Sequence, residues 1–276
     1  MKSDYCIGSE WVYFKIYCGY KAANVILRDT VPFFIEDIKN QKILKNWFFI
    51  RYNDPEPHLR LRIRLKNIGF FGDLIKIFNN HFDPLITNFT VSKIQLDTYS
   101  REIERYRDIN YDYTESFFEY DSEAILNYLV IEPRLDDEKY KLYYSFFAID
   151  SFLDICGFNL SKKHEVLKNL QKSFKTEFSI SSFTKKELLN SFREFEVNIE
   201  NVIKKMTFTN LTDIVDFRNS RIKNTDVDLC LSSLYISSFI HMSINRQFTS
   251  RQREYELIIY DHLFRFYEKK MYCNGL

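Results

Sequence analysis

Hydrophobic and polar residues alternate in four segments of the first hundred residues, and this pattern predicts β-strands. A period of two places successive side chains on opposite faces of a sheet. The predicted strands are residues 11–18, 46–52, 58–65 and 90–99. Helical spacing of apolar residues occurs between them, at 22–38 and 70–86. The resulting order, β-α-β-β-α-β, is the split ferredoxin-like pattern, in which an antiparallel sheet carries helices on one face.

After about Glu119, helical spacing replaces alternation. Five helices are predicted there, at residues 136–156, 161–178, 184–205, 228–248 and 251–270. The sequence therefore predicts an α+β fold, with an α+β half over residues 1–118 and a mainly helical half over residues 119–276. Since no evident linker separates the halves, we expect one compact functional unit.

The third predicted strand places three arginines on one face. Residues 58–65 read HLRLRIRL, so Arg60, Arg62 and Arg64 share one face and the aliphatic residues share the other. The simpler interpretation is a solvated face, because charged residues on a strand discourage pairing at a sheet edge. The alternative is a carboxylate site, since guanidinium groups bind carboxylates through paired hydrogen bonds. One small ligand needs fewer than three cations, so two could bind and one could be structural.

Composition excludes several classes of partner and chemistry. With 39 Lys and Arg against 38 Asp and Glu, the net charge is +1, which gives no reason to expect a polyanion or a membrane surface as partner. No apolar run is long enough to span a bilayer, and no signal peptide is present. The five scattered cysteines fit reduced thiols in a cytoplasmic protein. The histidines lack zinc-site spacing, and no phosphate-binding or dinucleotide-binding motif occurs.

A second candidate follows the fourth predicted strand, in the segment YSREIERYR at residues 99–107. Glu102 and Arg105 are three residues apart, so in a helical turn they share a face and can form an ion pair. An exposed pair of this kind contributes little to stability. A functional role requires the pair to lie near the arginine strand. The expected topology pairs the third strand with the first and does not by itself bring these two segments together.

The third candidate is His241, in the predicted helix 228–248. Ser233, Ser237, Ser238 and Asn245 are spaced from it so as to form one small, polar stripe on the helix. A lone helical histidine is usually a surface residue or a satisfied core residue. A polar stripe through an otherwise apolar helix suits the wall of a wetted cavity better than a packed core. An imidazole is also the side chain best suited to moving protons near neutral pH.

Together these segments resemble one known family. The stretches WFFIRYNDPEPHLRLRI (47–63), LDTYSREIERY (96–106) and FIHMSINR (239–246) are similar to the C-terminal glutamate-elimination domain of class I lantibiotic dehydratases. The same domain type is found in thiopeptide biosynthesis. Enzymes of this family esterify Ser or Thr of a precursor peptide with glutamate from glutamyl-tRNA. The elimination domain then expels glutamate and leaves dehydroalanine or dehydrobutyrine.

The resemblance implies roles for the candidate residues. Family motif residues fall on Arg60 and Arg62, on Glu102 and Arg105, and on His241. We expect His241, Arg62 and Arg105 to be catalytic, with the imidazole moving protons and the arginines stabilising the departing carboxylate. Arg60 and Glu102 are expected to bind the glutamyl group.

Arg64 extends the strand pattern, and we group it with the substrate-binding residues although no family motif residue falls on it. The hypothesis requires guanidinium groups from the early strand and the imidazole from the late helix to meet in one cavity.

The resemblance also implies partners. Full-length enzymes of the family carry a much longer N-terminal glutamylation region, which these 276 residues do not contain. We therefore expect the elimination half of a split dehydratase, with a glutamylated precursor peptide as substrate and a separate tRNA-dependent glutamylating subunit. Direct tRNA binding, a metal and a cofactor are not implied. A homodimer is compatible with the sequence.

Two other functions stay open. Enzymes that build the pyridine core of thiopeptides by [4+2] cycloaddition share this fold, but the resemblance implies that they lack the Arg/Glu/Arg set, so its presence favours elimination. The other alternative is a non-catalytic subunit that binds the leader peptide by adding it as a strand to a sheet edge.

Overall fold

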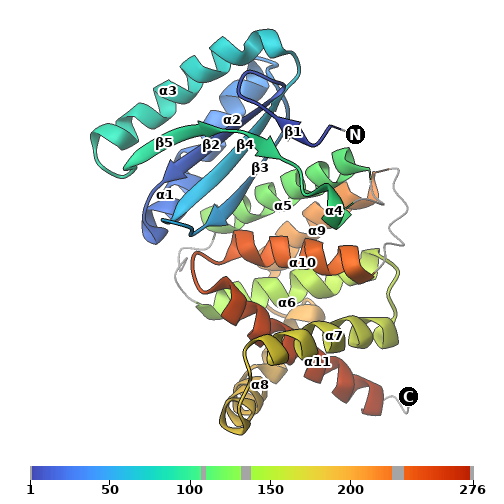
Figure 1. Cartoon of the computed structure of the whole chain (residues 1–276). Coiled ribbons are helices and arrows are strands. Elements are labelled where there is room, and N and C mark those ends of the chain that lie inside the picture. The colour runs from blue at the N-terminus through green and yellow to red at the C-terminus, as the bar shows by residue number, and fades with distance from the viewer. Residues whose placement is uncertain (1, 107–109, 132–137, 226–232, 274–276) are drawn as a thin grey trace. The chain divides into compact units, whose positions relative to one another are not determined.

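The computed structural model describes residues 2–106, 110–131, 138–225 and 233–273. The chain forms two compact units, Met1–Pro133 and Arg134–Leu276, and each is described by itself. The first contains the predicted sheet and the second is helical, which confirms the α+β class (Figure 1). The expected boundary near Glu119 falls inside helix α5 (Tyr111–Ile131), which belongs to the first unit.

The four predicted strands form one antiparallel sheet in the order β3-β4-β2-β5. Their bounds are β2 (Trp11–Tyr17), β3 (Leu44–Tyr52), β4 (His58–Leu65) and β5 (Lys93–Asp97). The predicted pairing of the third strand with the first is confirmed, since Arg62 of β4 lies opposite Tyr13 of β2. The fourth strand pairs with the other edge of β2 and places Asp97 opposite Tyr13. Because Phe48 of β3 lies opposite Arg62, one row of four residues crosses the sheet.

The aliphatic face of the sheet is covered by helices α1 (Tyr20–Asp29), α2 (Val31–Asn40) and α3 (Phe71–Thr87). Phe14 of β2 stacks on Phe78 of α3 with ring centroids 3.9 Å apart, and Phe34 of α2 meets Phe78 edge-on. The single helix predicted at 22–38 is instead two helices that separate at Thr30. Pro32 lies in the first turn of α2, where proline is favoured because it has no N–H to give to a preceding turn.

Helix α5 closes the outer edge of the sheet at β3. The hydroxyl of Ser122 accepts the backbone N–H of Phe49 at 3.2 Å and donates to the carbonyl of Phe118 at 2.7 Å. The side-chain amide of Asn46 donates to Glu119 at 3.0 Å. The buried residues of α5 are spread around the helix, so they form no narrow apolar stripe and the sequence pattern does not predict it.

A short ribbon follows β5. The chain leaves the sheet at Thr98, so the predicted strand 90–99 is split, and β6 (Tyr99–Ser100) pairs with β1 (Asp4–Tyr5). Tyr99 packs against Trp11 and Phe48 on the arginine face, with ring centroids 5.1 and 6.0 Å apart. The one-turn helix α4 (Ile103–Tyr106) comes next. The ribbon thereby carries the REIERY segment to the face that bears the arginines.

The second unit consists of helices in its described residues. They are α6 (Glu138–Ile155), α7 (Leu160–Glu177), α8 (Ser182–Ile203), α9 (Thr209–Lys223), α10 (Ser233–Gln247) and α11 (Gln252–Cys273). The sequence predicted all but α9, although residues 136–137 and 228–232 of the predicted helices lie outside the described residues. Asn159 and Ser181 cap α7 and α8 by accepting the backbone N–H groups of Lys162 and Thr184.

His262 of α11 should make the stability of the second unit depend on pH. Its side chain is fully buried among Phe146, Phe192 and Phe195, and burial lowers its pKa to about 4. In the unfolded chain, the imidazole of His262 takes up a proton at the ordinary pKa of about 6.5. The folded state should therefore lose about 3 kcal/mol of stability as the pH falls from about 6.5 to about 4. Unfolding by denaturant at several pH values measures how the free energy of unfolding changes with pH.

The matched variant for this effect is His262→Phe, which fills the same site with a ring that cannot titrate. We expect its free energy of unfolding to change less between about pH 6.5 and 4 than that of the wild type. Identical slopes for the two proteins would show that His262 does not carry the dependence.

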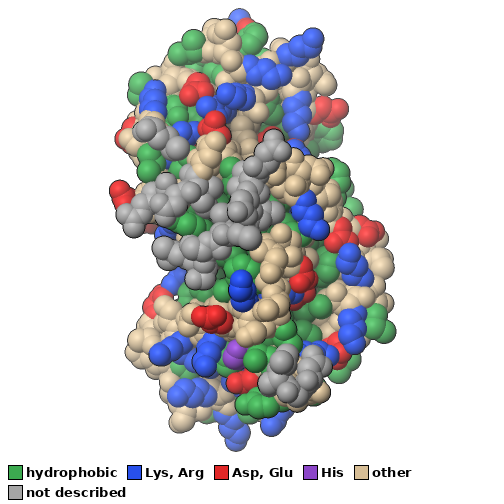
Figure 2. Space-filling view, turned by 90° about the vertical axis from the view of Figure 1, so that its right-hand side faces the viewer, with side chains coloured by type: hydrophobic (Ala, Val, Ile, Leu, Met, Phe, Trp, Pro, Cys, Tyr) green, Lys and Arg blue, Asp and Glu red, His purple; other side chains and the backbone are tan. Residues whose placement is uncertain are grey.

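Figure 2 shows one face, on which Lys and Arg side chains are interspersed with Asp and Glu. Within the described residues, no helix combines the length and the apolar character that crossing a bilayer requires.

Candidate functional site

Arg62 is a buried cation among aromatic rings. Arg62 is 7% exposed. Its guanidinium carbon lies 4.6, 4.9 and 5.2 Å from the ring centres of Tyr13, Tyr99 and Phe48, respectively. Sheet register explains the cage, because Tyr13 and Phe48 oppose Arg62 on the two neighbouring strands. Aromatic faces attract a cation but accept no conventional hydrogen bond.

Several buried donors at this cage have no acceptor in the part of the chain that the structure describes. Nε and Nη1 of Arg62 are buried and have no hydrogen-bond partner among the residues that the structure describes, and the same holds for the hydroxyl of Tyr13. A buried donor without an acceptor costs about 1–3 kcal/mol. An anion bound here would satisfy these groups, and a carboxylate matches the guanidinium geometry best.

Arg60 lies one row away and is half-buried. Its guanidinium carbon is 3.3 Å from the ring centre of Tyr52, and its Nε donates to Nε2 of His58 at 3.1 Å. Nδ1 of His58 is 2.8 Å from the carbonyl of Glu56, which fits a proton on Nδ1 and an unprotonated Nε2 that accepts from Arg60. Within the described part of the chain, no carboxylate pairs with Arg60. Its charge is therefore available to a second anionic group.

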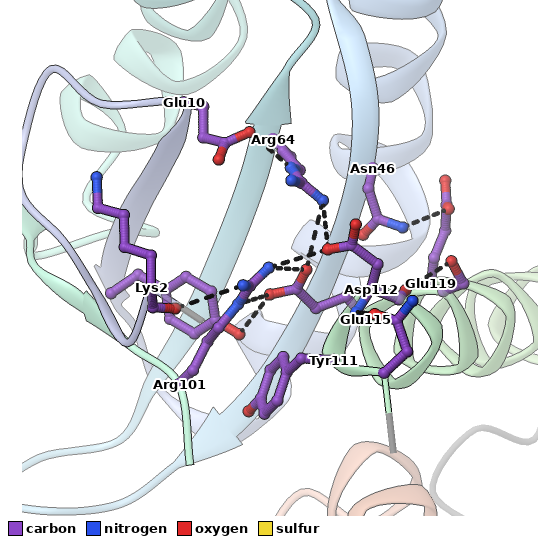
Figure 3. A network of polar contacts seen from close by, with 12 residues as sticks. Lys2, Glu10, Asn46, Arg64, Arg101, Tyr111, Asp112, Glu115 and Glu119 are labelled. Atoms are coloured by element: carbon purple, nitrogen blue, oxygen red, sulfur yellow. Dashed lines mark hydrogen bonds and ion pairs between the residues drawn. The ribbon is translucent and has the colours of Figure 1, made fainter. Parts of the chain in front are cut away.

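Arg64 differs from the other two arginines because carboxylates already surround it. Its Nε donates to Glu10 at 2.8 Å and its Nη1 to Asp112 at 2.9 Å, and Nη1 also lies 3.7 Å from Glu115 (Figure 3). These ion pairs favour the structural role for Arg64. The expectation that one of the three arginines is structural fits this member, and a contact of Arg64 with substrate stays a prediction.

Arg101 completes the buried network. Its Nη2 and Nε donate to the two oxygens of Glu115 at 2.6 and 2.7 Å, and Nη2 also lies 3.2 Å from Asp112. Tyr99 donates to Glu115 at 3.1 Å. Burial raises the pKa of the Glu115 carboxyl, although the hydrogen bonds from Arg101 act in the opposite direction. The network ties the first turns of α5 to the ribbon that carries Tyr99.

The predicted ion pair between Glu102 and Arg105 is confirmed. Arg105 Nη1 lies 2.9 Å from the carboxylate of Glu102, and the two side chains are 43% and 63% exposed. The backbone N–H of Glu102 donates to the hydroxyl of Tyr111 at 3.0 Å, which anchors the segment to α5. Both charged side chains are open to solvent and can exchange their mutual contact for a ligand at little cost.

His241 lies on α10 in the second unit, with a side chain that is 31% exposed. Its Nδ1 is 2.7 Å from Oε1 of Glu256, which α11 supplies. Within the described residues, Nε2 has no hydrogen-bond partner. The imidazole therefore has one nitrogen held by a carboxylate and the other accessible, which is the arrangement that a general base needs.

The candidate residues divide between the units. Arg60, Arg62, Arg64, Glu102 and Arg105 belong to the first unit. The three arginines of β4 share one face of the sheet, and the Glu102–Arg105 pair follows the ribbon whose Tyr99 packs on that face. His241 belongs to the second unit, so the expected shared cavity stays a prediction. In the described part of the chain, no group of three His, Cys, Asp or Glu side chains is placed to hold a metal ion.

Sequence reasoning missed Tyr13 and Tyr99 as members of the Arg62 cage, and Arg101 as its support. The alternation in WVYFKIYC carried a usable signal for Tyr13, because Trp11, Tyr13 and Lys15 share one face of β2. No sequence signal distinguishes the buried Arg101 from the exposed Arg105 four residues later.

Known proteins are similar to this chain over most of its length. The sequence profile of the family "Lantibiotic biosynthesis dehydratase C-term" matches residues 11–267. Nisin biosynthesis protein NisB of Lactococcus lactis subsp. lactis is 27% identical over 292 residues, covering 96% of this chain and 26% of NisB. Epidermin biosynthesis protein EpiB of Staphylococcus epidermidis is 26% identical, covering 90% of this chain and 25% of EpiB. This chain spans about a quarter of the length of these two relatives.

Solved structures share the fold. The tRNA-dependent lantibiotic dehydratase MibB from Microbispora sp. 107891 superposes with a TM-score of 0.65 at 17% identity, over 100% of this chain and 29% of MibB. The pyridine synthase TbtD from thiomuracin biosynthesis also gives 0.65, at 12% identity over 96% of this chain and 100% of TbtD. The profile match over nearly the whole chain decides the family: this chain belongs to the lantibiotic biosynthesis dehydratase C-terminal family.

Proposed function

We propose that this chain eliminates glutamate from glutamylated Ser or Thr residues of a ribosomally made precursor peptide, leaving dehydroalanine or dehydrobutyrine. The glutamyl ester is made beforehand by a tRNA-dependent glutamylating activity, to which we assign no residue of this chain. The observation that carries the proposal is the Arg62 cage, a buried guanidinium with two donors that have no acceptor among the described residues.

The chemistry needs a group that receives a carboxylate. A Ser hydroxyl is a poor leaving group, whereas the acylated oxygen departs as a carboxylate whose acid has a pKa of about 3.5. The Cα–H electron pair forms the Cα=Cβ bond, the proton passes to a base, and the Cβ–O electron pair leaves with glutamate. A positioned guanidinium stabilises the negative charge that develops on the departing oxygens.

The proposal divides the work between named residues. Arg62 receives the carboxylate that forms as the Cβ–O bond breaks, and Tyr13 donates its hydroxyl hydrogen beside it. Arg105 joins Arg62 in stabilising the departing carboxylate, and Arg60 holds the side-chain carboxylate of the glutamyl group. Glu102 binds the glutamyl ammonium or orients Arg105. His241 takes the proton from Cα through Nε2. Arg64 and Arg101 stabilise the cage through Glu115, which also accepts the hydrogen bond of the cage residue Tyr99.

The second candidate is pyridine formation by cycloaddition, which the shared fold with TbtD favours. That reaction expels no glutamate and so gives no reason for an unpaired, buried guanidinium. The presence here of Arg62 together with the Glu102–Arg105 pair supports elimination over cycloaddition.

Two substrates separate these functions. We expect the chain to convert a linear peptide with a glutamyl-Ser ester into a peptide lighter by one water than the unmodified form, and to release free glutamate, as followed by mass spectrometry. A dehydrated azole-containing peptide should stay unchanged. Conversion of the second peptide without the first would replace elimination by cycloaddition. Tight binding of both peptides without conversion would favour the non-catalytic role.

A further inference from the structure

A buried carboxylate holds His241 from one side. Oε1 of Glu256 lies 2.7 Å from Nδ1 of His241 and accepts the hydroxyl hydrogen of Tyr260 at 3.0 Å, while Oε2 accepts Nη1 of Arg253 at 2.8 Å. Glu256 is 1% exposed and Tyr260 is equally buried. Because Glu256, Arg253 and Tyr260 are all on α11 and His241 is on α10, the packing of two helices fixes the ring.

The hydrogen-bond chemistry of these groups decides where the imidazole proton lies. Arg253 donates to Oε2 of Glu256 and Tyr260 donates to Oε1, so both carboxylate oxygens act as hydrogen-bond acceptors in this network. Nδ1 of His241 must then be the donor. We propose that Glu256 is a positioning residue that fixes the Nδ1–H tautomer of His241 and leaves Nε2 unprotonated. The inference rests on the proposed function only for what Nε2 then does.

Replacing Glu256 with Gln should reverse the tautomer. The amide has one oxygen and one NH2 group, and Arg253 requires the oxygen because it has no acceptor. The NH2 group then faces His241, so Nδ1 becomes the acceptor and the proton moves to Nε2. Tyr260 can adapt because its hydroxyl also accepts. Replacing one carboxylate oxygen of Glu256 by an NH2 group thus protonates Nε2 of His241 and leaves the imidazole ring in place.

The tautomer can be read directly from 15N-histidine NMR on the full chain. Protonated and unprotonated ring nitrogens have separate shifts and different couplings to the ring hydrogens, and His241→Phe identifies the signal among the five histidines. At an alkaline pH above which the spectrum no longer changes, we expect Nδ1–H in the wild type and Nε2–H in Glu256→Gln. An Nε2–H or doubly protonated ring in the wild type would overturn the proposal.

Two further variants make the test specific. Arg253→Met/Glu256→Gln frees the amide to turn its oxygen toward His241, so the Nδ1–H tautomer should return. The exposed Glu177, which Arg253 also contacts, can be solvated. Tyr260→Phe removes one buried hydrogen bond from Glu256 but leaves its contact with Nδ1, so it should keep the wild-type tautomer. If the double variant keeps the Nε2–H tautomer, the proposed mechanism is wrong. It is also wrong if Tyr260→Phe alone changes the tautomer.

Kinetics then connect the tautomer to turnover. Glu256→Gln should lower kcat for elimination about 10- to 100-fold with KM nearly unchanged, and the double variant should recover most of it. If the tautomer switches as expected but the wild type eliminates no glutamate, the proposed function fails and the positioning role stands. If the wild type eliminates glutamate and Glu256→Gln leaves the tautomer unchanged, the positioning role fails alone.

Discussion

Arg62→Met should lower the rate of glutamate elimination by about 100- to 1000-fold, because loss of one preorganised donor to a developing oxyanion costs about this much. The glutamylated peptide should accumulate, as mass spectrometry of the reaction mixture will show. Arg62→Lys keeps the charge but loses the forked geometry, so its rate should fall between those of the wild type and Arg62→Met.

Stability provides the control for this variant. Met fills the same aromatic cage and removes two buried donors that have no acceptor among the described residues, so the thermal midpoint of Arg62→Met should equal or exceed that of the wild type. A folded Arg62→Met protein that eliminates glutamate at the wild-type rate would refute the assignment of Arg62. A variant that merely unfolds would instead contradict the analysis of the cage.

Glu115→Ala should destabilise the first unit by about 3–5 kcal/mol, since it removes the buried carboxylate partner of Arg101 and leaves only the exposed Asp112 beside that buried charge. Glu115 is 1% exposed and receives hydrogen bonds from both Arg101 and Tyr99. Chemical denaturation followed by tryptophan fluorescence should detect the loss, because both tryptophans, Trp11 and Trp47, are buried in this unit.

Asp112→Ala is the matched control, because it removes a carboxylate from the same network and the same helix. Its side chain is 55% exposed, so the expected cost is only about 1 kcal/mol. Replacing both Arg101 and Glu115 with Met should restore most of the stability, as apolar residues often replace a buried ion pair without loss. If Asp112→Ala costs as much as Glu115→Ala, burial does not set the strength of this network.

Strict alternation made the sheet predictable. In β4 every second residue is aliphatic and buried, and this period fixed both the strand and the shared face of the arginines. The sequence pattern did not predict helix α5, because its buried residues, such as Tyr113, Glu115 and Tyr128, do not form one stripe. Apolar periodicity predicts an element that has one face buried and the other exposed to solvent. An element that is buried on several sides does not show this periodicity.

The arginine face of the sheet was predictable in its residue types and not in the partners of each arginine. The sequence indicated that Arg60, Arg62 and Arg64 share a face, but their surroundings differ because Asp112 and Glu115 reach Arg64 alone. These carboxylates come from a helix that begins about fifty residues later in the chain, and local spacing cannot assign such a partner. The aromatic cage likewise depends on register across three strands.

The contact between Ser122 and Phe49 limits how copies of this chain can associate through the four-stranded sheet. Unpaired strand edges invite addition of further strands, and α5 occupies the edge at β3. Two copies could therefore join their four-stranded sheets through β5, using the same surface on each, and such a contact is related by a two-fold axis and ends at two chains. Continued growth into a filament requires two different open edges, and within the described residues α5 covers the edge at β3.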